Sequence, residues 1–530
     1  MLHASCFMKK YTPVIGMEIH VELKTKSKMF CQCKNGLGLE KTPNIDICPV
    51  CTAQPGTLPV PNIEAIKFVQ LAGLALGCSL RQISKFDRKN YFYPDLPKGY
   101  QISQYDQPFC EKGKLEIEVS PRETRGETST KKVIRITRIH LEEDTGKLIH
   151  PKGVEYTLVD FNRAGVPLME LVTEPDIETG EEARIFCQKL QQICRYLEIS
   201  DADMEKGNMR CEVNISLREI TDERGNKSQM NAEFQRKPAL SPRKSAPLGT
   251  KVEVKNINSF KFVEKAINFE IERQTEMLDK GEKIVQETRG WDANKGETVS
   301  QRKKESAHDY RYFPEPDIPP FSFDEKYIND LKRKLPELPA QKEERFQKEY
   351  NLPAGDVDVL TNDKDLAEYF EQVVSEIKEK IKCKEYECVE DKAIKLSANY
   401  VITELRKYMV LENHKIQDLK ITPENYAELI CIVAGGKINS SAAQTVLAQM
   451  YATGGDPSQI IEEKNLAQMD NLDELEKIVD EILAKNEKSV VDFKAGKENA
   501  LKFLIGQTMA MTKGKANPQI VQEIVKNKLK

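Results

Sequence analysis

Two carboxylates and an imidazole alternate with apolar residues close to the N-terminus. Glu18, His20 and Glu22 occupy every second position of residues 16–23, and apolar residues fill the positions between them. Successive side chains of a β-strand point to opposite faces, so the three polar groups share one face. Such a face suits a divalent cation or a proton-transfer site. A solvated edge strand has the same pattern, and this segment alone does not separate the two interpretations.

A second acidic cluster, residues 140–144, reads His-Leu-Glu-Glu-Asp and is able to complete such a site. Two later segments, residues 211–218 and 252–258, repeat the alternation, and Glu253 and Lys255 share a face in the second of them. Three strands with polar groups on one face predict a concave polar sheet, where a Mg²⁺–phosphate ligand could bind. A sheet with one solvated face is the alternative, and spacing alone favours it.

Four of the 13 cysteines form two close pairs. One residue separates Cys31 from Cys33, and two residues separate Cys48 from Cys51. Thiolates placed in this way by tight turns are typical of a zinc knuckle, a tetrahedral site with no open position for a substrate. Four reduced structural cysteines are the alternative. The total is odd and most other cysteines are scattered, which argues against a secreted disulfide framework.

Cations are interleaved with aromatic residues in residues 85–95, and residues 308–317 have a similar composition. The cations of the first block that could bind a ligand are Lys85, Arg88 and Lys89. Cations beside aromatic rings can hold phosphates, nucleotides or a tRNA end, and a surface loop anchored by aromatic residues is the alternative. The sequence has no Walker-type phosphate loop, so an ATP site would need another architecture.

A chain of 530 residues is longer than one hydrophobic core normally accommodates, which predicts about three domains. Short alternating runs separated by turns occupy residues 14–300 and predict a large mixed α/β domain with much antiparallel sheet. Within this domain, residues 221–250 are polar and aperiodic, which predicts a long loop or an irregular insertion. From about residue 320, amphipathic patterns predict helices. Thr422, a helix-capping residue, followed by Pro423 at the first helical position predicts the start of a further helix.

The overall charge is nearly balanced, with a formal net charge of −4 and 31% charged residues. Any contact with nucleic acid must therefore come from local basic patches or from shape. No apolar run is long enough to cross a membrane, and the N-terminal residues lack the apolar core of a signal peptide and the composition of a transit peptide. We therefore expect a soluble, cytoplasmic protein without a membrane partner.

An ordered series of motifs covers the chain from about residue 12 to the C-terminus. These motifs are residues 14–23, 85–95, 100–104, 140–144, 160–170, 174–176, 255–260, 286–289 and 310–317. Together they resemble the GatB family, the B-type subunits of the tRNA-dependent amidotransferases. The resemblance implies an α+β fold with a mixed, largely antiparallel-sheet cradle domain, an all-α helical domain and a small all-α tail domain similar to YqeY proteins. We expect these domains at residues 1–320, 321–415 and 416–530.

The family acts in a heterotrimeric ligase, whose other members are an amidase of type A and a small protein of type C. The resemblance implies that the amidase releases ammonia from glutamine. The GatB member then phosphorylates, with ATP, the side-chain carboxylate of the amino acid on Glu-tRNA(Gln) or Asp-tRNA(Asn). Ammonia displaces the phosphate and gives Gln-tRNA(Gln) or Asn-tRNA(Asn) for translation.

Phosphoryl transfer onto a carboxylate brings two anions together, and Mg²⁺ neutralises and aligns them. By similarity, the residues expected near this ion are Glu18, His20, Glu142 and Glu143, which we take as catalytic, with Glu170 and Glu212 as further candidates. The similarity also suggests that Lys85, Arg88 and Lys89 meet ATP phosphates or the tRNA acceptor end. The cysteine quartet resembles a zinc knuckle present in many family members, so a structural Zn²⁺ would stiffen the cradle.

The resemblance implies a tRNA partner, which would be recognised mostly through shape and backbone. Lysine-rich residues 494–530 are the candidate contact for the tRNA body, with a solvated helix face as the alternative. The segment between Arg218 and Gly249 is longer than we expect for the family, but far shorter than the synthetase-like insertion of the archaeal relative GatE. We therefore favour the bacterial three-subunit type. A non-catalytic scaffold and a metal-dependent hydrolase are the alternative functions.

Overall fold

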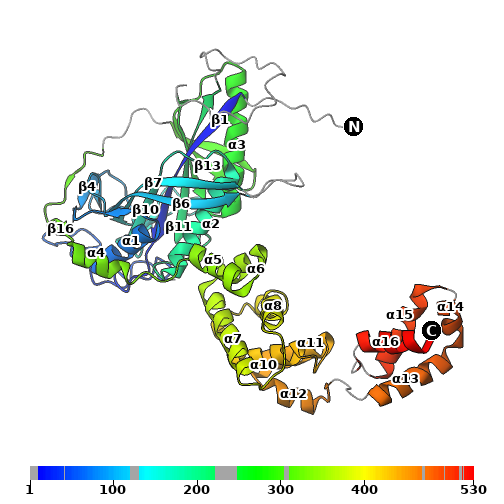
Figure 1. Ribbon diagram of the computed structural model, residues 1–530. Helices are drawn as coiled ribbons and strands as arrows, with labels where there is room; N and C mark the ends of the chain where they lie inside the picture. Colours follow the sequence, from blue (N-terminus) through cyan, green and yellow to red (C-terminus); the bar gives the residue numbers. More distant parts are fainter. Residues whose placement is uncertain are drawn as a thin grey trace. The chain divides into compact units, whose positions relative to one another are not determined.

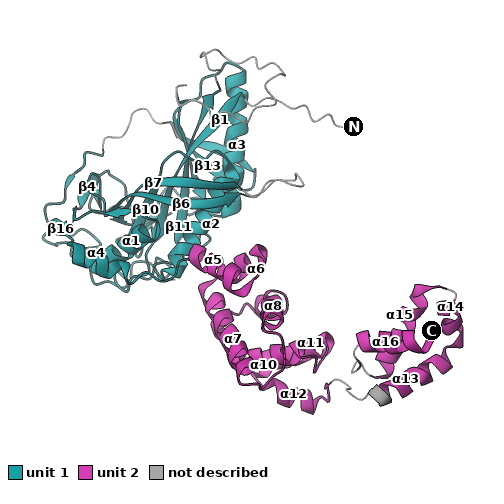
Figure 2. Ribbon diagram, viewed as in Figure 1, with its two compact units in different colours: residues 1–338 teal, residues 339–530 magenta. Residues whose placement is uncertain are grey.

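The structure is a computed structural model (Figure 1). It describes residues 10–529 except 41, 120–129, 221–247, 304–309, 468–471, 495, 513–515 and 517. The chain divides into two compact units, Met1–Leu338 and Pro339–Lys530 (Figure 2). Almost all of the predicted insertion at 221–250 lies outside the described residues.

A nine-stranded sheet forms the centre of the first unit, and β1 lies in its middle (Figure 1). The strand order is β14-β13-β12-β11-β1-β10-β7-β6-β2, and every neighbouring pair is antiparallel except the parallel pair β12–β13. The strands are β1 (Tyr11–Glu22), β2 (Ser79–Leu80), β6 (Cys110–Val119), β7 (Thr130–Glu143), β10 (Pro167–Thr173), β11 (Met209–Glu219), β12 (Val252–Ile257), β13 (Glu287–Asp292) and β14 (Glu297–Lys303).

Among the described residues, three smaller sheets accompany the large one, in the orders β15-β4-β5, β16-β3 and β8-β9. Their strands are β3 (Ile83–Ser84), β4 (Asp87–Asn90), β5 (Tyr100–Ser103), β8 (Lys147–Ile149), β9 (Leu158–Asp160), β15 (Phe313–Pro314) and β16 (Phe321–Ser322). The β4–β5 pair lies against the end of β7, where the amide of Gln101 donates a hydrogen bond of 2.6 Å to the carbonyl oxygen of Glu143. The cation-rich block is thereby brought to the large sheet.

The helices of the first unit are α1 (Ile63–Ala75), α2 (Gly180–Tyr196), α3 (Phe260–Asp279) and α4 (Glu325–Lys332). Each begins after a polar residue whose side chain accepts a backbone hydrogen bond, as helix N-termini require: these residues are Asn62, Thr179, Ser259 and Asp324. Helix α4 belongs to this unit because it packs on α1, where the Tyr327 hydroxyl donates to Gln70 at 2.7 Å. The first unit therefore extends to Leu338, beyond residue 320.

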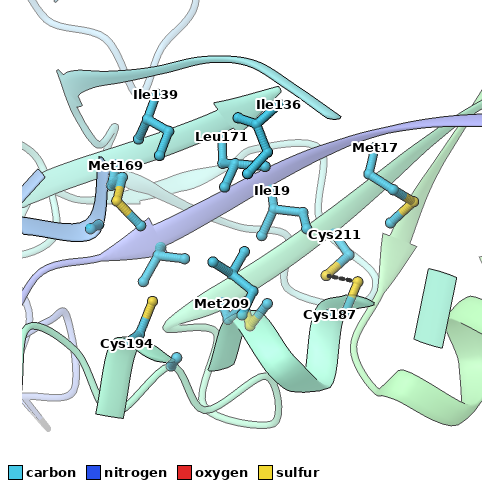
Figure 3. Packing of buried hydrophobic residues seen from close by; sticks show 14 of the residues in the cluster. Met17, Ile19, Ile136, Ile139, Met169, Leu171, Cys187, Cys194, Met209 and Cys211 are labelled. Atoms are coloured by element: carbon cyan, nitrogen blue, oxygen red, sulfur yellow. Dashed lines mark hydrogen bonds between the residues drawn. The ribbon is translucent and has the colours of Figure 1, made fainter. Parts of the chain in front are cut away.

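The apolar side of β1 lies in the core of the first unit, as its alternation predicts. Ile15, Met17 and Ile19 are at most 1% exposed. Burial of each such side chain stabilises the fold by about 1.5–3 kcal/mol. Helix α2 packs beneath this face, where the Sγ atoms of Cys187 and Cys211 lie 3.6 Å apart (Figure 3). The polar side of β1 is consequently held on the opposite face of the sheet.

The described part of the second unit is helical. Its α-helices are α5 (Pro339–Tyr350), α6 (Ala354–Thr361), α7 (Lys364–Lys382), α8 (Glu390–Tyr400), α9 (Arg406–Glu412), α10 (Pro423–Ala434), α11 (Ser440–Thr453), α12 (Pro457–Glu463), α13 (Leu472–Lys485), α14 (Glu487–Lys494), α15 (Glu498–Met511) and α16 (Pro518–Leu529). A π-helical turn, Val401–Leu405, joins α8 to α9. The predicted start of α10 is confirmed, because Thr422 accepts a hydrogen bond from the Asn425 backbone at 3.2 Å. None of the helices among the described residues has the length and apolarity needed to span a membrane.

The residues of the second unit that the structure describes contain two buried hydrophobic clusters. One extends from Phe346 to Ile461, and the other from Leu475 to Leu529. Helices α7 and α10 share the first cluster, and the Tyr369 hydroxyl donates to the Ile421 carbonyl there at 3.3 Å. The observed fold confirms the predicted class, a mixed and largely antiparallel sheet domain followed by helical regions. The domain limit at 415/416 stays a prediction, although it falls inside the first of these clusters.

Candidate active site and cysteine cluster

The register of the antiparallel strands places four polar side chains in one row across the large sheet. His20 on β1 lies opposite Glu170 on β10 and opposite Arg210 on β11. Glu170 in turn lies opposite His140 on β7. Directly opposed residues of antiparallel strands project from the same face, so this row crosses the polar face at the middle of the sheet.

One group of potential ligands combines His20, Glu142 and Glu170, with one atom of each lying within 4.8 Å of the others. The His20 Nε2 atom is 3.3 Å from Glu170 Oε2 and 3.9 Å from Glu142 Oε1. His140 Nε2 is also 3.3 Å from Glu170 Oε2, and the Ser103 hydroxyl donates to Glu142 at 2.9 Å. An imidazole nitrogen and two carboxylates are a suitable donor set for a divalent cation.

The electrostatics of this group follow from burial and from crowding of the carboxylates. Burial lowers the pKa of His20, but Glu170 and other nearby carboxylates outweigh burial and raise the pKa to about 9. Burial raises the pKa of Glu170, and the imidazoles of His140 and His20 more than reverse this, so its pKa lies well below the ordinary value. A metal ligand imidazole must be neutral, so cation binding at His20 is coupled to release of a proton.

A second group of carboxylates lies beside the first, formed by Glu18 on β1, Glu212 on β11 and Glu253 on β12. The Lys255 ammonium is 2.9 Å from Glu212 and 3.6 Å from Glu253, and the Asn214 amide donates to Glu18 at 2.7 Å. Burial and neighbouring carboxylates raise the pKa of Glu18. Lys255 therefore supplies one positive charge to a group that would otherwise hold three negative ones.

The cysteines predicted to form a metal site lie together. The Cys51 Sγ atom is 3.5 Å from that of Cys31, 3.7 Å from that of Cys48 and 3.9 Å from that of Cys33. Tetrahedral Zn²⁺ with Zn–S bonds of about 2.3 Å requires sulfur–sulfur distances of about 3.8 Å. Lys28, which is fully buried, places its ammonium 3.8 Å from Cys51 Sγ. The cluster thus has the geometry of a four-sulfur metal site with a cation beside it.

Two family models match the chain: the "GatB/GatE catalytic domain" covers residues 13–329, and the "GatB domain" covers residues 368–529. The chain belongs to the GatB family. Similar proteins include those of Caldicellulosiruptor bescii (46% identical) and Thermotoga neapolitana (46%), each covering 98% of this chain and 99% of the relative. The protein of Thermoanaerobacter pseudethanolicus is 45% identical with the same coverage. All three are named as the B-type subunit of an aspartyl/glutamyl-tRNA(Asn/Gln) amidotransferase.

The three cations expected from the GatB resemblance occupy different surroundings. Lys89 lies at the first ligand group, with its ammonium 3.8 Å from Glu142 Oε2. Arg88, the neighbouring residue on β4, points the other way and forms a bidentate ion pair of 2.7 and 2.8 Å with Glu315. Lys85 pairs with Asp106 at 2.7 Å. Lys89 is therefore the cation of this block that contacts the carboxylates of the candidate site.

The carboxylates expected near Mg²⁺ do not all lie in the same ligand group. Glu18 and Glu212 lie in the second ligand group, whereas Glu142 and Glu170 lie in the first. Glu143 lies in neither group, because it directly follows Glu142 on β7 and its side chain points to the other face. Its carboxylate accepts a hydrogen bond of 2.9 Å from the Ile102 backbone and is 2.7 Å from the Lys98 ammonium.

Two residues of the candidate site were not predicted as ligands from the sequence. His140 contacts Glu170 in the first group, and Glu253 belongs to the second. The alternation of β7 places His140 on the same face as Glu142, and this signal was present in the GatB motif at 140–144. The contact of Glu253 with Glu18 depends on the pairing of β11 with both β1 and β12, which the sequence alone does not specify.

Proposed function

We propose that this chain is the member of a tRNA-dependent amidotransferase that uses ATP to activate the side-chain carboxylate of Glu-tRNA(Gln) or Asp-tRNA(Asn) for amidation. Its partners would be a glutaminase of type A, which supplies ammonia, and a small protein of type C. The observation that carries this proposal is the combination of His20, Glu142 and Glu170 with Lys89 on the polar face of the sheet. The 46% identity to a member of the family over 98% of the chain supports the reaction class.

Each side chain of the first group has a task in this reaction. Mg²⁺ held by His20, Glu142 and Glu170 would supply the positive charge that phosphoryl transfer between two anions requires. His140 orients Glu170, and the Ser103 hydroxyl orients Glu142. The Lys89 ammonium lies at the edge of the group and is placed to bind a phosphate oxygen. The attacking carboxylate therefore meets a site in which positive charge is already arranged.

The cysteine cluster has a structural role in this proposal. Zn²⁺ bound by the four thiolates would have no open coordination position and would fix the fold of residues 31–51. The Lys28 ammonium stabilises the thiolate of Cys51, whose pKa is about 5 because Cys31 donates to it and Lys28 lies nearby, against the opposing effect of burial.

Amidation by the three-subunit complex tests the proposed function. The complex receives Mg-ATP, either Glu-tRNA(Gln) or Asp-tRNA(Asn), and ammonium chloride as nitrogen donor, so that glutaminase activity does not limit the result. We expect amide product on at least one tRNA, and an about 100-fold slower reaction for His20→Ala. His150→Ala is the matched control, because His150 is exposed and pairs only with Thr157 in the described structure.

The alternatives predict other results in the same assay. A scaffold would bind tRNA without forming product. A metal-dependent hydrolase would consume ATP at the same rate without aminoacylated tRNA. Either outcome with an intact wild-type complex contradicts the proposed function.

A further inference from the structure

The ion pair between Arg210 and Asp144 passes over the polar face of the sheet. Arg210 lies on β11 and Asp144 directly follows β7, and two strands, β1 and β10, separate β11 from β7. Adjacent strands are about 4.8 Å apart, so three strand spacings amount to about 14 Å across the sheet. The Arg210 Nη2 atom is nevertheless 2.6 Å from Asp144 Oδ2. Arg210 projects from the same face as His20, which lies directly opposite it, so the guanidinium lies on the face that carries the candidate active site.

Asp144 is held firmly in place to receive this arginine. Its backbone N–H donates to the Val166 carbonyl at 2.8 Å, and its carbonyl accepts from Gly165 at 2.9 Å. Its side chain is 4% exposed, and Arg163 Nε lies 3.5 Å from the same Oδ2 atom. Asp144 therefore fixes one edge of the guanidinium of Arg210.

The remainder of the Arg210 side chain is available to a ligand. A guanidinium has five N–H donors, and Asp144 accepts the hydrogen bond from one nitrogen. No other hydrogen bond of this side chain is found within the described parts of the chain, and 34% of its surface is exposed. Arg210 also lies directly opposite His20, a member of the first ligand group. The carboxylates of Glu22 and Glu212 also lie near enough to act on its charge. A guanidinium that is hydrogen-bonded at one edge and keeps further N–H donors is suited to a phosphate, which guanidinium groups bind through paired hydrogen bonds.

We propose that Arg210 is a catalytic residue that binds the transferred phosphoryl group, and that Asp144 is the positioning residue that holds it over the site. This inference rests on the proposed function. In the reaction, an oxygen of the substrate carboxylate forms a bond to the γ-phosphorus of ATP, the bond to the β-phosphate oxygen breaks, and ADP leaves. Ammonia then forms the C–N bond, the C–O bond to phosphate breaks, and the amine proton passes to solvent. Arg210 keeps its protons and stabilises the charge on the equatorial oxygens.

The alternative is that the ion pair only joins β11 to the end of β7. The two roles make different predictions for variants in the full complex. In Arg210→Ala we expect aminoacyl-tRNA-dependent ADP formation per folded molecule to fall about 100-fold or more in kcat, while tRNA binding and glutaminase activity stay close to wild type. The melting temperature should fall, because the buried Asp144 loses its nearest cation, so rates are compared per folded molecule. A purely structural ion pair would lower the melting temperature and leave the rate per folded molecule unchanged. Arg135→Ala is the matched control, since the exposed Arg135 on β7 forms a bidentate ion pair with Asp176.

A charge-conserving variant covers the case in which Arg210→Ala does not fold. Arg210→Lys keeps an ion pair with Asp144 but cannot offer paired donors, so we expect ADP formation at least about tenfold below wild type. Rates within about threefold of wild type in a folded variant overturn the role of Arg210. Failure of the wild-type complex to amidate either tRNA would instead contradict the proposed function, so the two failures are distinguishable.

Discussion

Glu170 and Glu270 are both buried glutamates of the first unit, but their surroundings differ. Glu270 on α3 is 0% exposed. It accepts hydrogen bonds from Arg273 at 2.8 Å and Gln274 at 3.0 Å, and lies 3.1 Å from Arg289. Every negative charge in this network has a fixed donor. Two guanidinium groups neutralise this carboxylate, so the network stabilises the packing of α3 on β13 and β14 and leaves the charge of Glu270 no capacity for a ligand.

Glu170 is surrounded instead by groups that compete for the same few positive charges. Its Oε2 atom lies 3.3 Å from both His20 and His140, and a second carboxylate, Glu142, is within reach of the same imidazoles. Buried like charges with shared partners are costly for stability, and they are typical of sites that bind cations or move protons. Burial of a carboxylate therefore does not identify a functional site. The number of positively charged partners relative to the number of carboxylates around it does.

Substitution of Glu170 is the strongest test of this comparison. Glu170→Gln removes the charge that both imidazoles contact, and we expect amidation with ammonium chloride to fall about 1000-fold, equivalent to about 4 kcal/mol in the activation barrier. The melting temperature should change little. Product formation near the wild-type rate would show that this carboxylate does not take part in the reaction.

The matched substitution, Glu270→Gln, should have the opposite consequence. Arg273 and Arg289 would lose the charge they share, and we expect the free energy of unfolding to fall by about 3 kcal/mol in urea denaturation. Amidation per folded molecule should remain close to wild type. A loss of activity as large as that of Glu170→Gln, without a loss of stability, would contradict the structural role of Glu270.

The protonation of His20 should produce a smaller, pH-dependent effect. The ordinary pKa is 6.5, and the carboxylates around the buried ring raise it in the folded protein to about 9. The folded state therefore binds this proton more tightly than the unfolded state, so the stabilisation is complete below pH 6.5 and is lost as the pH rises through about 9. In the presence of chelator, the stability difference between wild type and His20→Gln should be larger at about pH 6 than at about pH 10. A difference that does not vary with pH would contradict this account.

Removal of the proposed zinc should have a smaller effect on activity than the loss of Glu170. Cys51→Ser should abolish zinc binding, as measured by elemental analysis, and lower the melting temperature, while amidation falls less than about tenfold because the cluster has no open coordination position. Cys383→Ser is the control, since Cys383 is exposed and lies in the second unit. Wild-type protein without zinc, purified from zinc-containing medium, would favour four reduced structural cysteines.

The parts of the site that sequence predicted well are those set by local periodicity. The alternation of residues 16–23 gave the buried and polar faces of β1 correctly, and the spacing of the cysteines brought four thiols together. The contacts between strands were not predictable in the same way. Arg210 meets His20 only because β11 pairs with β1 in one particular register, and a shift by one residue would turn its side chain to the other face.

Lys85, Arg88 and Lys89 illustrate the same limit within one short segment. They are close in sequence, yet only Lys89 contacts Glu142. Arg88 lies on the opposite side of β4, and Lys85 precedes this strand and pairs with Asp106. The composition of residues 85–95 identified the segment, and the direction of each side chain decided which cation reaches the site.

The central position of β1 also has a consequence for how the protein is made. Ile15 pairs with Ile215, so the first strand to be synthesised waits for a partner 200 residues later in the chain. At about 5–20 residues per second, translation leaves β1 without this partner for about 10–40 s. An alternating strand with two open edges is prone to pair with other chains, and charged residues along it oppose such pairing. Glu18 and Glu22, which belong to the polar face of the finished enzyme, thereby protect the nascent chain from aggregation before any active site exists.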